Sequence, residues 1–413
     1  MVSLTPTRSG FEPAGQMQTN DAPTTTEARG IMLAFAEQTG VSSSRNPPRR
    51  YLWTDAHAVC NFLSLYRRTR DETYLRLALS LIDQVHAVLG KHRADDPRSG
   101  WISGLRDEEG GNHPTVAGLR IGKHLNERGR HDAFDERLEW DRDGQYFHYL
   151  TKWMHALCRA SAVTNPSKFS RWALELAKVA QAKFAFAVPG DTRKRLRWKM
   201  SIDLAYPLVP SSGLHDPLDA YITYHEIAAC LQRSGRRDAL PALGGEIAET
   251  AAMIEGQRWH TDDPLGLGGL LFDTYRAMQL CAAGHLQNVD FVTELGQASA
   301  VSLDAFVQSA RLQDPAQYRL AFRELGLSIG LKAAPGMASL VAQYPGHFAE
   351  SLGRDIEAMT KFSSVGETIE RFWLQGEHQK TQSWQDHLDI NRVMLATSLL
   401  PEEFLNVMDY STS

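Results

Sequence analysis

The sequence predicts an all-α protein folded as an (α/α)6 toroid, in which paired inner and outer helices close into a ring. Helical periodicity runs through most of the chain, and no stretch outside two irregular segments alternates as a β-strand would. Six predicted helices share one kind of start, an aspartate ahead of an apolar run, where the helix end stabilises a carboxylate. Spacings of about 50 to 90 residues fit one helical hairpin per repeat. The aspartates are Asp55, Asp143, Asp216, Asp263, Asp314 and Asp389. A right-handed α-solenoid, the alternative, would predict more even spacing and shorter connections.

Composition describes an ordinary globular protein. The 413 residues are 43% hydrophobic and 23% charged, which supports a sizeable core. The net charge of −5 gives no reason to expect nucleic acid or an anionic membrane as a partner. No apolar run approaches the roughly 20 residues of a membrane helix, and the N-terminus lacks a signal-peptide pattern. The oligomeric state stays open.

The cysteines are expected to be buried free thiols. Each lies inside a predicted apolar helix, and no CxxC spacing occurs among Cys60, Cys158, Cys230 and Cys281. This usage fits a reducing compartment, so a cytoplasmic location is expected.

The first residues differ in composition from the rest. Residues 1–26 are rich in Thr, Pro, Gly, Ser and Gln, which predicts a disordered leader before a single domain over 27–413. A helix is expected over 27–38. Because the helix that begins at Asp389 lacks a downstream partner of full length, we expect 27–38 to pair with it and close the ring.

The remaining helices are expected in pairs. The first pair joins 51–68 to a helix opened by Asp71 and Glu72, acids that suit the first turn. The other expected pairs are 143–162 with 167–185, 219–233 with 240–254, 267–283 with 289–308, and 316–333 with 348–361. The run Gly266-Leu267-Gly268-Gly269 does not follow a strand, so it predicts close helix packing rather than a phosphate loop.

Two long segments lose the helical period. Residues 91–140 are punctuated by glycines, and 188–215 contain a basic run from Arg193 to Lys199. Irregular segments of this length inside a compact domain are usually functional. Because both lead into helices that open with aspartates, we expect them to cover the same rim of the ring.

One hairpin resembles a known superfamily. Trp53-Thr54-Asp55 opens its first helix, and Thr69-Arg70-Asp71-Glu72-Thr73-Tyr74-Leu75 forms the turn into its partner. This pattern is similar to the hairpin of the six-hairpin glycosidase superfamily, although Arg70 stands where that pattern has glycine. The resemblance implies the toroid fold and carbohydrate chemistry. It does not separate glycoside hydrolases, unsaturated uronyl hydrolases, polysaccharide lyases and sugar epimerases.

Carboxylates at the helix starts are the candidate catalytic residues. A glycoside hydrolase needs one carboxyl group to protonate the leaving oxygen and another to activate water or attack carbon. We predict Asp143 as the principal acid/base residue, with Asp55 or Asp219 as its partner and Asp141 beside it. Crowded carboxylates would raise one pKa and so supply the protonated acid. Helix capping is the competing interpretation for each of them.

Aromatic, basic and imidazole side chains near the same helix starts are the candidate substrate-binding residues. Flat rings stack on a pyranose but also fill ordinary cores, and arginines can clamp a carboxylate or phosphate. Histidines could act as acid or base, as in sugar epimerases, yet no metal-ligand spacing occurs, so neither metal nor cofactor is expected. The predicted set is Trp53, His57, Glu139, Trp140, Tyr146, His148, Tyr149, Arg195, Arg197, Trp198, His215, Tyr221, His225, Trp384 and His387.

These features favour an enzyme acting on a small carbohydrate, most simply a glycoside hydrolase with paired carboxylates. A sugar epimerase or uronate-processing enzyme on the same toroid is one alternative. A terpene-cyclase-like barrel is disfavoured because its aspartate-rich signatures are missing. A non-catalytic helical scaffold is the last alternative, and it would not require acids and aromatics to gather at one rim.

Overall fold

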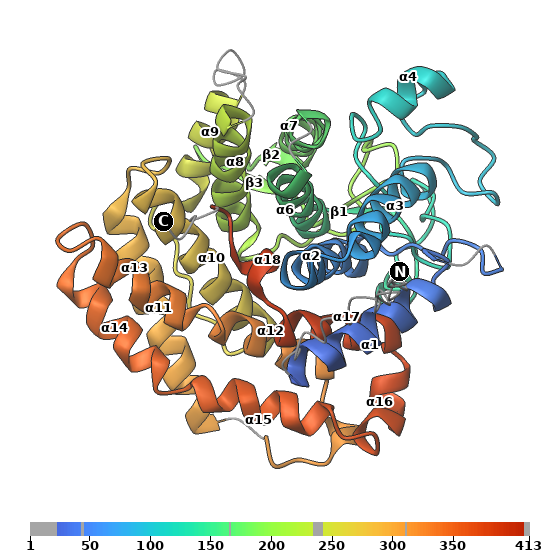
Figure 1. Cartoon of the computed structure of the whole chain (residues 1–413). Helices are drawn as coiled ribbons and strands as arrows, with labels where there is room; N and C mark the ends of the chain where they lie inside the picture. Colours follow the sequence, from blue (N-terminus) through green and yellow to red (C-terminus); the bar gives the residue numbers. More distant parts are fainter. Residues whose placement is uncertain (1–22, 43–44, 165–166, 234–242, 310–311, 409–413) are drawn as a thin grey trace, which may run out of the picture.

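The computed structural model describes residues 23–42, 45–164, 167–233, 243–309 and 312–408, and it shows a ring of helices (Figure 1). Each inner helix packs against the next, and the last packs against the first. Each of the six predicted aspartates lies in the first turn of one of these helices or shortly before it, so the predicted toroid is confirmed. The inner helices are α2 (Leu52–Thr69), α6 (Phe147–Thr164), α8 (Asp216–Arg233), α10 (Pro264–Ala282), α12 (Ala321–Leu331) and α17 (Leu388–Leu399).

Outer helices cover this ring. Four pairs follow the predicted order, because α2, α6, α8 and α10 each pack on the helix that comes next in the chain. These outer helices are α3 (Glu72–Leu89), α7 (Ser167–Phe184), α9 (Gly244–Ile254) and α11 (Val289–Ser309).

The pairing predicted for the fifth hairpin is wrong. The outer partner of α12 is α15 (Ser363–Trp373), whereas α14 (Glu350–Thr360), which covers the expected 348–361, packs on α11 and on α13 (Ala334–Gln343). Asp314 also does not start α12 directly. A single turn of 3-10 helix, η2 (Ala316–Tyr318), comes first, and α12 begins only at Ala321.

The ring closes through the helix near the start of the chain. Helix α1 (Pro23–Gln38) packs on α17, and Arg392 donates to the side-chain oxygen of Gln38 at 2.6 Å. The predicted pairing of 27–38 with the helix at Asp389 is therefore confirmed. Helix α1 begins at Pro23, inside the expected leader, and residues 1–22 lie outside the described part of the chain.

The turn between α2 and α3 explains the departure from the superfamily pattern. Arg70 has a φ of 59°, the left-handed conformation that glycine adopts most easily. Asp71 then caps α3, because its carboxylate accepts from the amide of Thr73 at 2.8 Å. Arg70 thus takes the backbone conformation of the glycine that it replaces.

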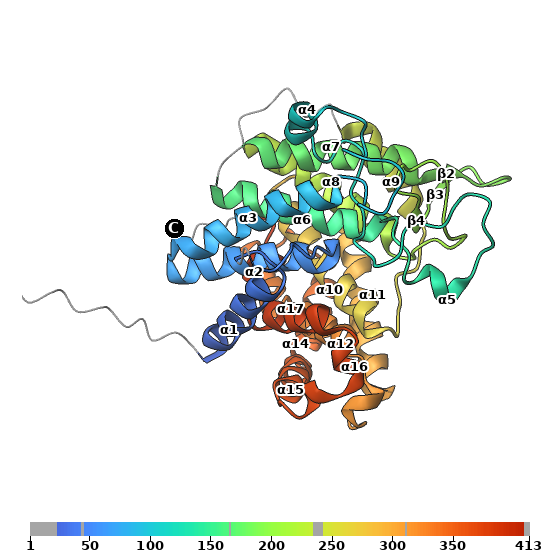
Figure 2. The same ribbon diagram turned by 90° about the vertical axis from the view of Figure 1, so that its right-hand side faces the viewer.

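The two irregular segments pack together beside the starts of α2, α6 and α8. Figure 2 shows α5, β3 and β4, which belong to these segments, on the same side of the ring. The two-residue strand β1 (Gln145–Tyr146), just before α6, pairs with β4 (Lys199–Met200) in the second segment. The three-residue strands β2 (Ala185–Ala187) and β3 (Lys194–Leu196) form a hairpin at the start of the second segment. Short helices α4 (Asp107–Asn112) and α5 (Glu136–Glu139) complete the first segment. Tyr206 Oη donates to the carbonyl of Arg128 at 2.8 Å. The expected shared rim is confirmed.

Close packing of α10 on α12 confirms the role predicted for the glycine run. A Cβ on Gly268 would lie 2.1 Å from the carbonyl oxygen of Gly326, so no side chain fits there. The expectation that no apolar run approaches the length of a membrane helix is wrong for one described stretch, Ala321–Gln343, which is long and apolar enough by length and composition. In the structure 61% of its most apolar window is buried, as in a core helix of the ring.

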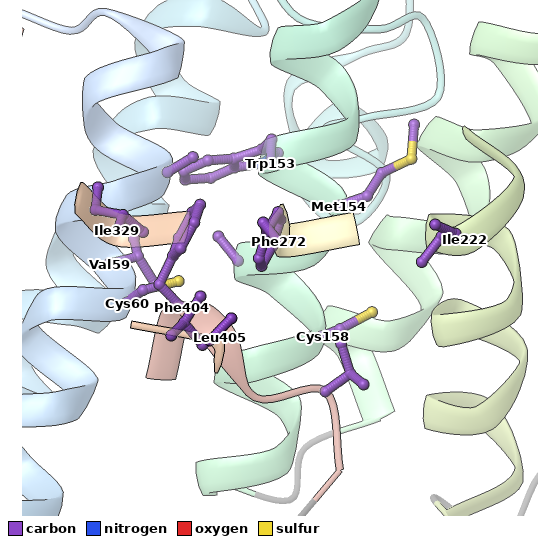
Figure 3. Close-up of a cluster of buried hydrophobic side chains, with 14 of the residues drawn as sticks. Val59, Cys60, Trp153, Met154, Cys158, Ile222, Phe272, Ile329, Phe404 and Leu405 are labelled. Carbon is purple, nitrogen blue, oxygen red and sulfur yellow. The ribbon is translucent and has the colours of Figure 1, made fainter. Parts of the chain in front are cut away.

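The ring has a filled centre. After α17 the chain turns inward and forms α18 (Glu402–Leu405), which Figure 1 shows in the middle of the ring. Phe404 and Leu405 lie there among core side chains such as Val59, Cys60 and Phe272 (Figure 3). All four cysteines are buried and free, as the sequence predicts.

Candidate functional site

A small cavity of about 60 Å³ lies at the centre of the ring. Five of the six inner helices contribute to its wall, and α18 contributes Phe404. Much of its lining is apolar, with Lys152 as its charged residue. The lining residues are Trp53, His57, Lys152, Leu265, Gly268, Gly269, Phe272, Gly326, Ile329, Met394 and Phe404.

Trp53 connects this cavity to an aromatic surface at the rim. Its ring centroid lies 4.9 Å from that of His57, 5.9 Å from that of His148 and 5.3 Å from that of Tyr149. The hydroxyls of Tyr149 and Tyr51 are 2.6 Å apart. The N-terminal ends of α2 and α6 therefore lie side by side and place these rings together.

The aromatic surface continues outward through the irregular segments. Tyr146 contacts Trp198 with a centroid distance of 5.4 Å, and Trp198 contacts Trp140 edge to face at 5.7 Å. Trp140 is 51% exposed, so the outer end of the surface faces solvent. The structure thus brings together seven predicted substrate-binding residues in one connected set: Trp53, His57, Trp140, Tyr146, His148, Tyr149 and Trp198.

His57 and His148 are neutral and have opposite tautomers. Burial lowers the pKa of each to about 3. Nδ1 of His57 lies 3.0 Å from the carbonyl oxygen of Trp53, which can only accept, so the lone pair of His57 is on Nε2. Nδ1 of His148 accepts from the indole N–H of Trp198 at 3.1 Å, so its proton is on Nε2. Neither Nε2 has a hydrogen-bond partner among the described residues, so one acceptor and one donor flank Trp53.

Asp219 is held as a carboxylate beside the cavity. Nζ of Lys152 lies 2.8 Å from its Oδ2, and a guanidinium nitrogen of Arg276 lies 3.0 Å from its Oδ1. The hydroxyl of Thr151 also donates to it. Burial alone would raise the pKa of Asp219, but the two cations hold it well below its ordinary value. Asp219 is thus ionised.

Asp216 lies one helical turn before Asp219 and has the opposite protonation behaviour. Burial, followed by the negative charge of Asp219, raises the pKa of Asp216 from 3.8 to about 7. Its Oδ2 is buried without a hydrogen-bond partner among the described residues. A Cβ on Gly213 would lie 2.3 Å from that oxygen, so the loop before α8 packs directly on the carboxyl group. Burial also raises the pKa of Asp273, to about 6.

The structure does not place Asp143 in the cavity wall. It is fully buried, and it accepts from Arg120 at 2.5 Å and from the amides of Gly122 and Gly144 at 3.0 Å each. These bonds tether residues 120–122 to the start of α6. Its surroundings favour a structural ion pair, and the predicted catalytic role stays untested.

The other two predicted catalytic residues are also outside the cavity wall. Asp55 is buried in the first turn of α2 and accepts from the amide of the N-cap residue Tyr51 at 2.9 Å, as the acid of a capping box does. Burial raises its pKa to about 6. Asp141 is exposed at the rim. Of the predicted acids, only Asp219 adjoins the cavity.

The remaining predicted residues are dispersed. Tyr221 and His225 contact each other, and Tyr221 faces Phe291 of the outer helix α11, away from the cavity. Trp384 is a core residue stacked on Trp373 at 5.5 Å. The others lie on the periphery of the site. Glu139 is buried against Lys199, His215 and His387 adjoin the starts of α8 and α17, and Arg195 and Arg197 lie on or beside the β2–β3 hairpin.

Sequence reasoning missed the cations and the floor of the cavity. Lys152 and Arg276 each interrupt an apolar helical run, Thr151-Lys152-Trp153-Met154 and Tyr275-Arg276-Ala277-Met278, and a charge in such a run signals a buried partner. No comparable signal exists for Phe404. Within the described ranges, no three His, Cys, Asp or Glu side chains gather in a way that could hold a metal ion.

Comparisons with known proteins identify the fold. No protein-family model and no curated protein matches the sequence. Solved structures similar to the chain include the α-1,6-mannanase GH76A of Salegentibacter sp. HEL1_6, as an inactive variant with α-1,6-mannotriose. That comparison has a TM-score of 0.50 and 13% identity, and it covers 93% of this chain and 100% of the mannanase chain. A sugar epimerase from a ruminal bacterium is also similar, with a TM-score of 0.46, 10% identity, and 91% and 98% coverage. At 13% identity, the likeness to the mannanase shows the (α/α)6 fold alone.

Proposed function

We propose that the protein is a glycoside hydrolase that acts on a small oligosaccharide or glycoside at the aromatic rim of the ring. One observation carries the proposal. Asp216 and Asp219 are neighbouring carboxyl groups whose environments drive their pKa values apart, as a paired acid and carboxylate require. The aromatic surface supplies faces on which pyranose rings can stack.

In this mechanism Asp216 is the general acid. Its raised pKa keeps a proton on the carboxyl group near neutral pH, and that proton passes to the leaving glycosidic oxygen. Asp219, ionised beside Lys152 and Arg276, attacks the anomeric carbon or takes a proton from the attacking water. Water is consumed, the C–O bond breaks, and a new reducing end appears. Because Gly213 packs on Asp216, we expect the 211–215 loop to shift when substrate binds.

The size of the cavity decides where the sugar lies. At about 60 Å³ the cavity is far smaller than the roughly 300 to 1,000 Å³ of typical ligand pockets, so it does not enclose a whole pyranose ring. The substrate therefore rests on Trp53 and the rings beside it, with its longer part over Trp198 and Trp140. This placement puts the reacting bond near the start of α8.

A sugar epimerase is the second candidate, and a different observation favours it. Nε2 of His57 can accept a proton, and Nε2–H of His148 can donate one, from positions flanking Trp53. Such a pair could remove a proton from the carbon next to a sugar carbonyl and return one to it. The low pKa values of both histidines make them weak bases, which counts against this candidate.

One experiment separates the two. The protein is incubated in D2O with a panel of oligosaccharides that includes α-1,6-mannotriose, and reducing ends and carbon-bound deuterium are both measured. A hydrolase releases reducing ends without deuterium at carbon, and an epimerase does the opposite. Asp216→Asn and Asp219→Asn should each abolish hydrolysis, whereas Asp141→Asn, an exposed control on the same rim, should not. A panel that gives neither product, or Asp216→Asn with full activity, would overturn the hydrolase proposal.

A further inference from the structure

The C-terminal segment closes the ring at the end opposite the aromatic rim. Its partners lie in the second halves of the inner helices. The buried carboxylate of Glu403 pairs with Arg159 and Arg67 at 2.8 Å each, and its amide donates to the hydroxyl of Ser64 at 3.1 Å. Arg159 and Glu403 are almost fully buried, so this ion pair is shielded from water. Residues 402–405 are thus fixed to α2 and α6.

Backbone bonds hold the next residues. Nε2 of His155 lies 2.9 Å from the carbonyl oxygen of Phe404, and Gln279 donates to the carbonyl of Leu405 at 2.9 Å. Gln279 also accepts from the amide of Val407 at 3.0 Å. The segment is therefore anchored from α2, α6 and α10 at successive residues, and it has no room to slide along the ring axis.

This anchoring places one side chain at the base of the central cavity. The ring of Phe404 stacks on His57 with a centroid distance of 4.4 Å and on Phe272 with a centroid distance of 4.5 Å. Both partners line the cavity, and so does Phe404. The phenyl group fills the space between α2 and α10 below Trp53. Figure 3 shows it among Val59, Cys60 and Ile329.

We propose that Phe404 is a specificity-determining residue, because it sets the depth of the central cavity and so limits what part of a substrate can enter it. The proposal rests on the proposed function for its substrate class, which is a short saccharide. In the wild-type protein the cavity admits only a substituent of a sugar ring. Because residues 402–405 close the far end of the helical ring, a saccharide chain cannot pass through it. A saccharide with a bulky substituent at the reacting unit is excluded by the phenyl group.

The test compares three variants. Phe404→Ala removes the floor, Phe404→Leu lowers it partly, and Phe184→Ala is the matched control. Phe184 is fully buried and contacts Phe147 at a centroid distance of 5.4 Å, but it does not line the cavity. Should Phe404→Ala fail to fold, Phe404→Leu gives the same readouts with smaller amplitude.

The first readout does not depend on enzymatic activity. Benzene enters apolar cavities left by core truncation, and here it would lie beneath Trp53. We expect benzene to shift the indole N–H resonance of Trp53, assigned with a Trp53→Phe spectrum, in Phe404→Ala but not in wild type or Phe184→Ala. No response in either Phe404 variant would overturn the proposal. This readout stands even if no saccharide is turned over, an outcome that would overturn only the proposed function.

The second readout is selectivity. We measure kcat/KM for paired glycosides that differ only in a bulky substituent on the reacting unit. The kcat/KM for the bulky glycoside divided by that for the unsubstituted glycoside should rise at least about tenfold in Phe404→Ala. It should rise less in Phe404→Leu and not at all in Phe184→Ala. A fall in kcat/KM that is equal for both substrates would assign Phe404 a purely structural role and overturn the proposal.

Discussion

Asp216 and Asp219 lie one turn apart on α8, yet two buried cations contact Asp219, whereas no cation among the described residues contacts Asp216. Burial, and after it the negative charge of Asp219, raises the pKa of Asp216 to about 7. The pair therefore combines an ionised carboxylate with a proton donor at neutral pH. Its properties follow from the burial of Asp216 and from the position of Lys152 and Arg276 beside Asp219.

Replacing Asp216 with Asn should change how stability depends on pH. Between pH 4 and 7 the folded protein keeps this carboxyl group protonated while the unfolded chain ionises it, so stability falls as pH rises through this range. Asn does not titrate. The free energy of unfolding of Asp216→Asn, relative to wild type, should therefore rise by about 4 kcal/mol between pH 4 and 8. Urea unfolding at both pH values measures it. A constant difference would show that Asp216 has an ordinary pKa.

Replacing Asp143 with Asn should destabilise the protein. Asn still accepts from the amides of Gly122 and Gly144 but leaves the guanidinium of Arg120 buried without its counter-charge. We expect a loss of about 3 kcal/mol in unfolding free energy and faster proteolysis within 91–140. Asp141→Asn is the exposed control and should change stability by less than about 0.5 kcal/mol. A stable Asp143→Asn that has lost turnover would instead support the catalytic role predicted from the sequence.

Replacing Arg70 with Gly should stabilise the protein. The φ of 59° at this position is unfavourable for a residue with a Cβ, and glycine removes that strain. Glycine also makes the unfolded chain more flexible, which offsets part of the gain. We expect a net gain of about 1 kcal/mol, measured by urea unfolding. An Arg70→Ala variant keeps the Cβ and should show no gain. Equal effects of Gly and Ala would mean that the arginine side chain itself is responsible.

Replacing Trp140 with Ala should affect long substrates more than short ones. Trp140 is half exposed at the outer end of the aromatic surface, so its loss removes a stacking face without disturbing the core. We expect KM to rise about tenfold for oligosaccharides that reach it, corresponding to about 1.4 kcal/mol, and to stay constant for a simple glycoside. Leu125→Ala, also exposed on the irregular segments, is the control. Equal changes for both substrates would contradict a distal binding role.

Periodicity in the sequence predicts the parts of the site that lie on regular helices. Trp53, His148 and Tyr149 sit within the first turns of α2 and α6, and helices that begin at one rim bring such residues together. The placement of Asp143 could not be predicted in the same way. Its partner Arg120 lies in a segment without helical or strand periodicity, so no sequence pattern indicates that Arg120 and Asp143 are in contact.

The floor of the cavity is also hidden from sequence reasoning. Helix α18 has four residues, too few to show a helical period. Its anchors Arg159 and Gln279 are separated from it by more than a hundred positions. The sequence predicts that Trp384 binds substrate, because it is an aromatic residue near a helix start. In the structure it lies in the core and stacks on Trp373. Proximity to a helix start does not determine which way a side chain faces.

The seam between α1 and α17 has a consequence for how the protein is made. Gln38 and Arg392, which meet across the seam, are 354 positions apart along the chain. At ribosomal speeds of about 5 to 20 residues per second, α17 emerges about 20 to 70 seconds after α1. During that interval the apolar face of α1, with Met32 and Phe35, lacks the helix that covers it in the finished ring. The nascent chain thus presents a natural binding surface for a chaperone until the ring closes.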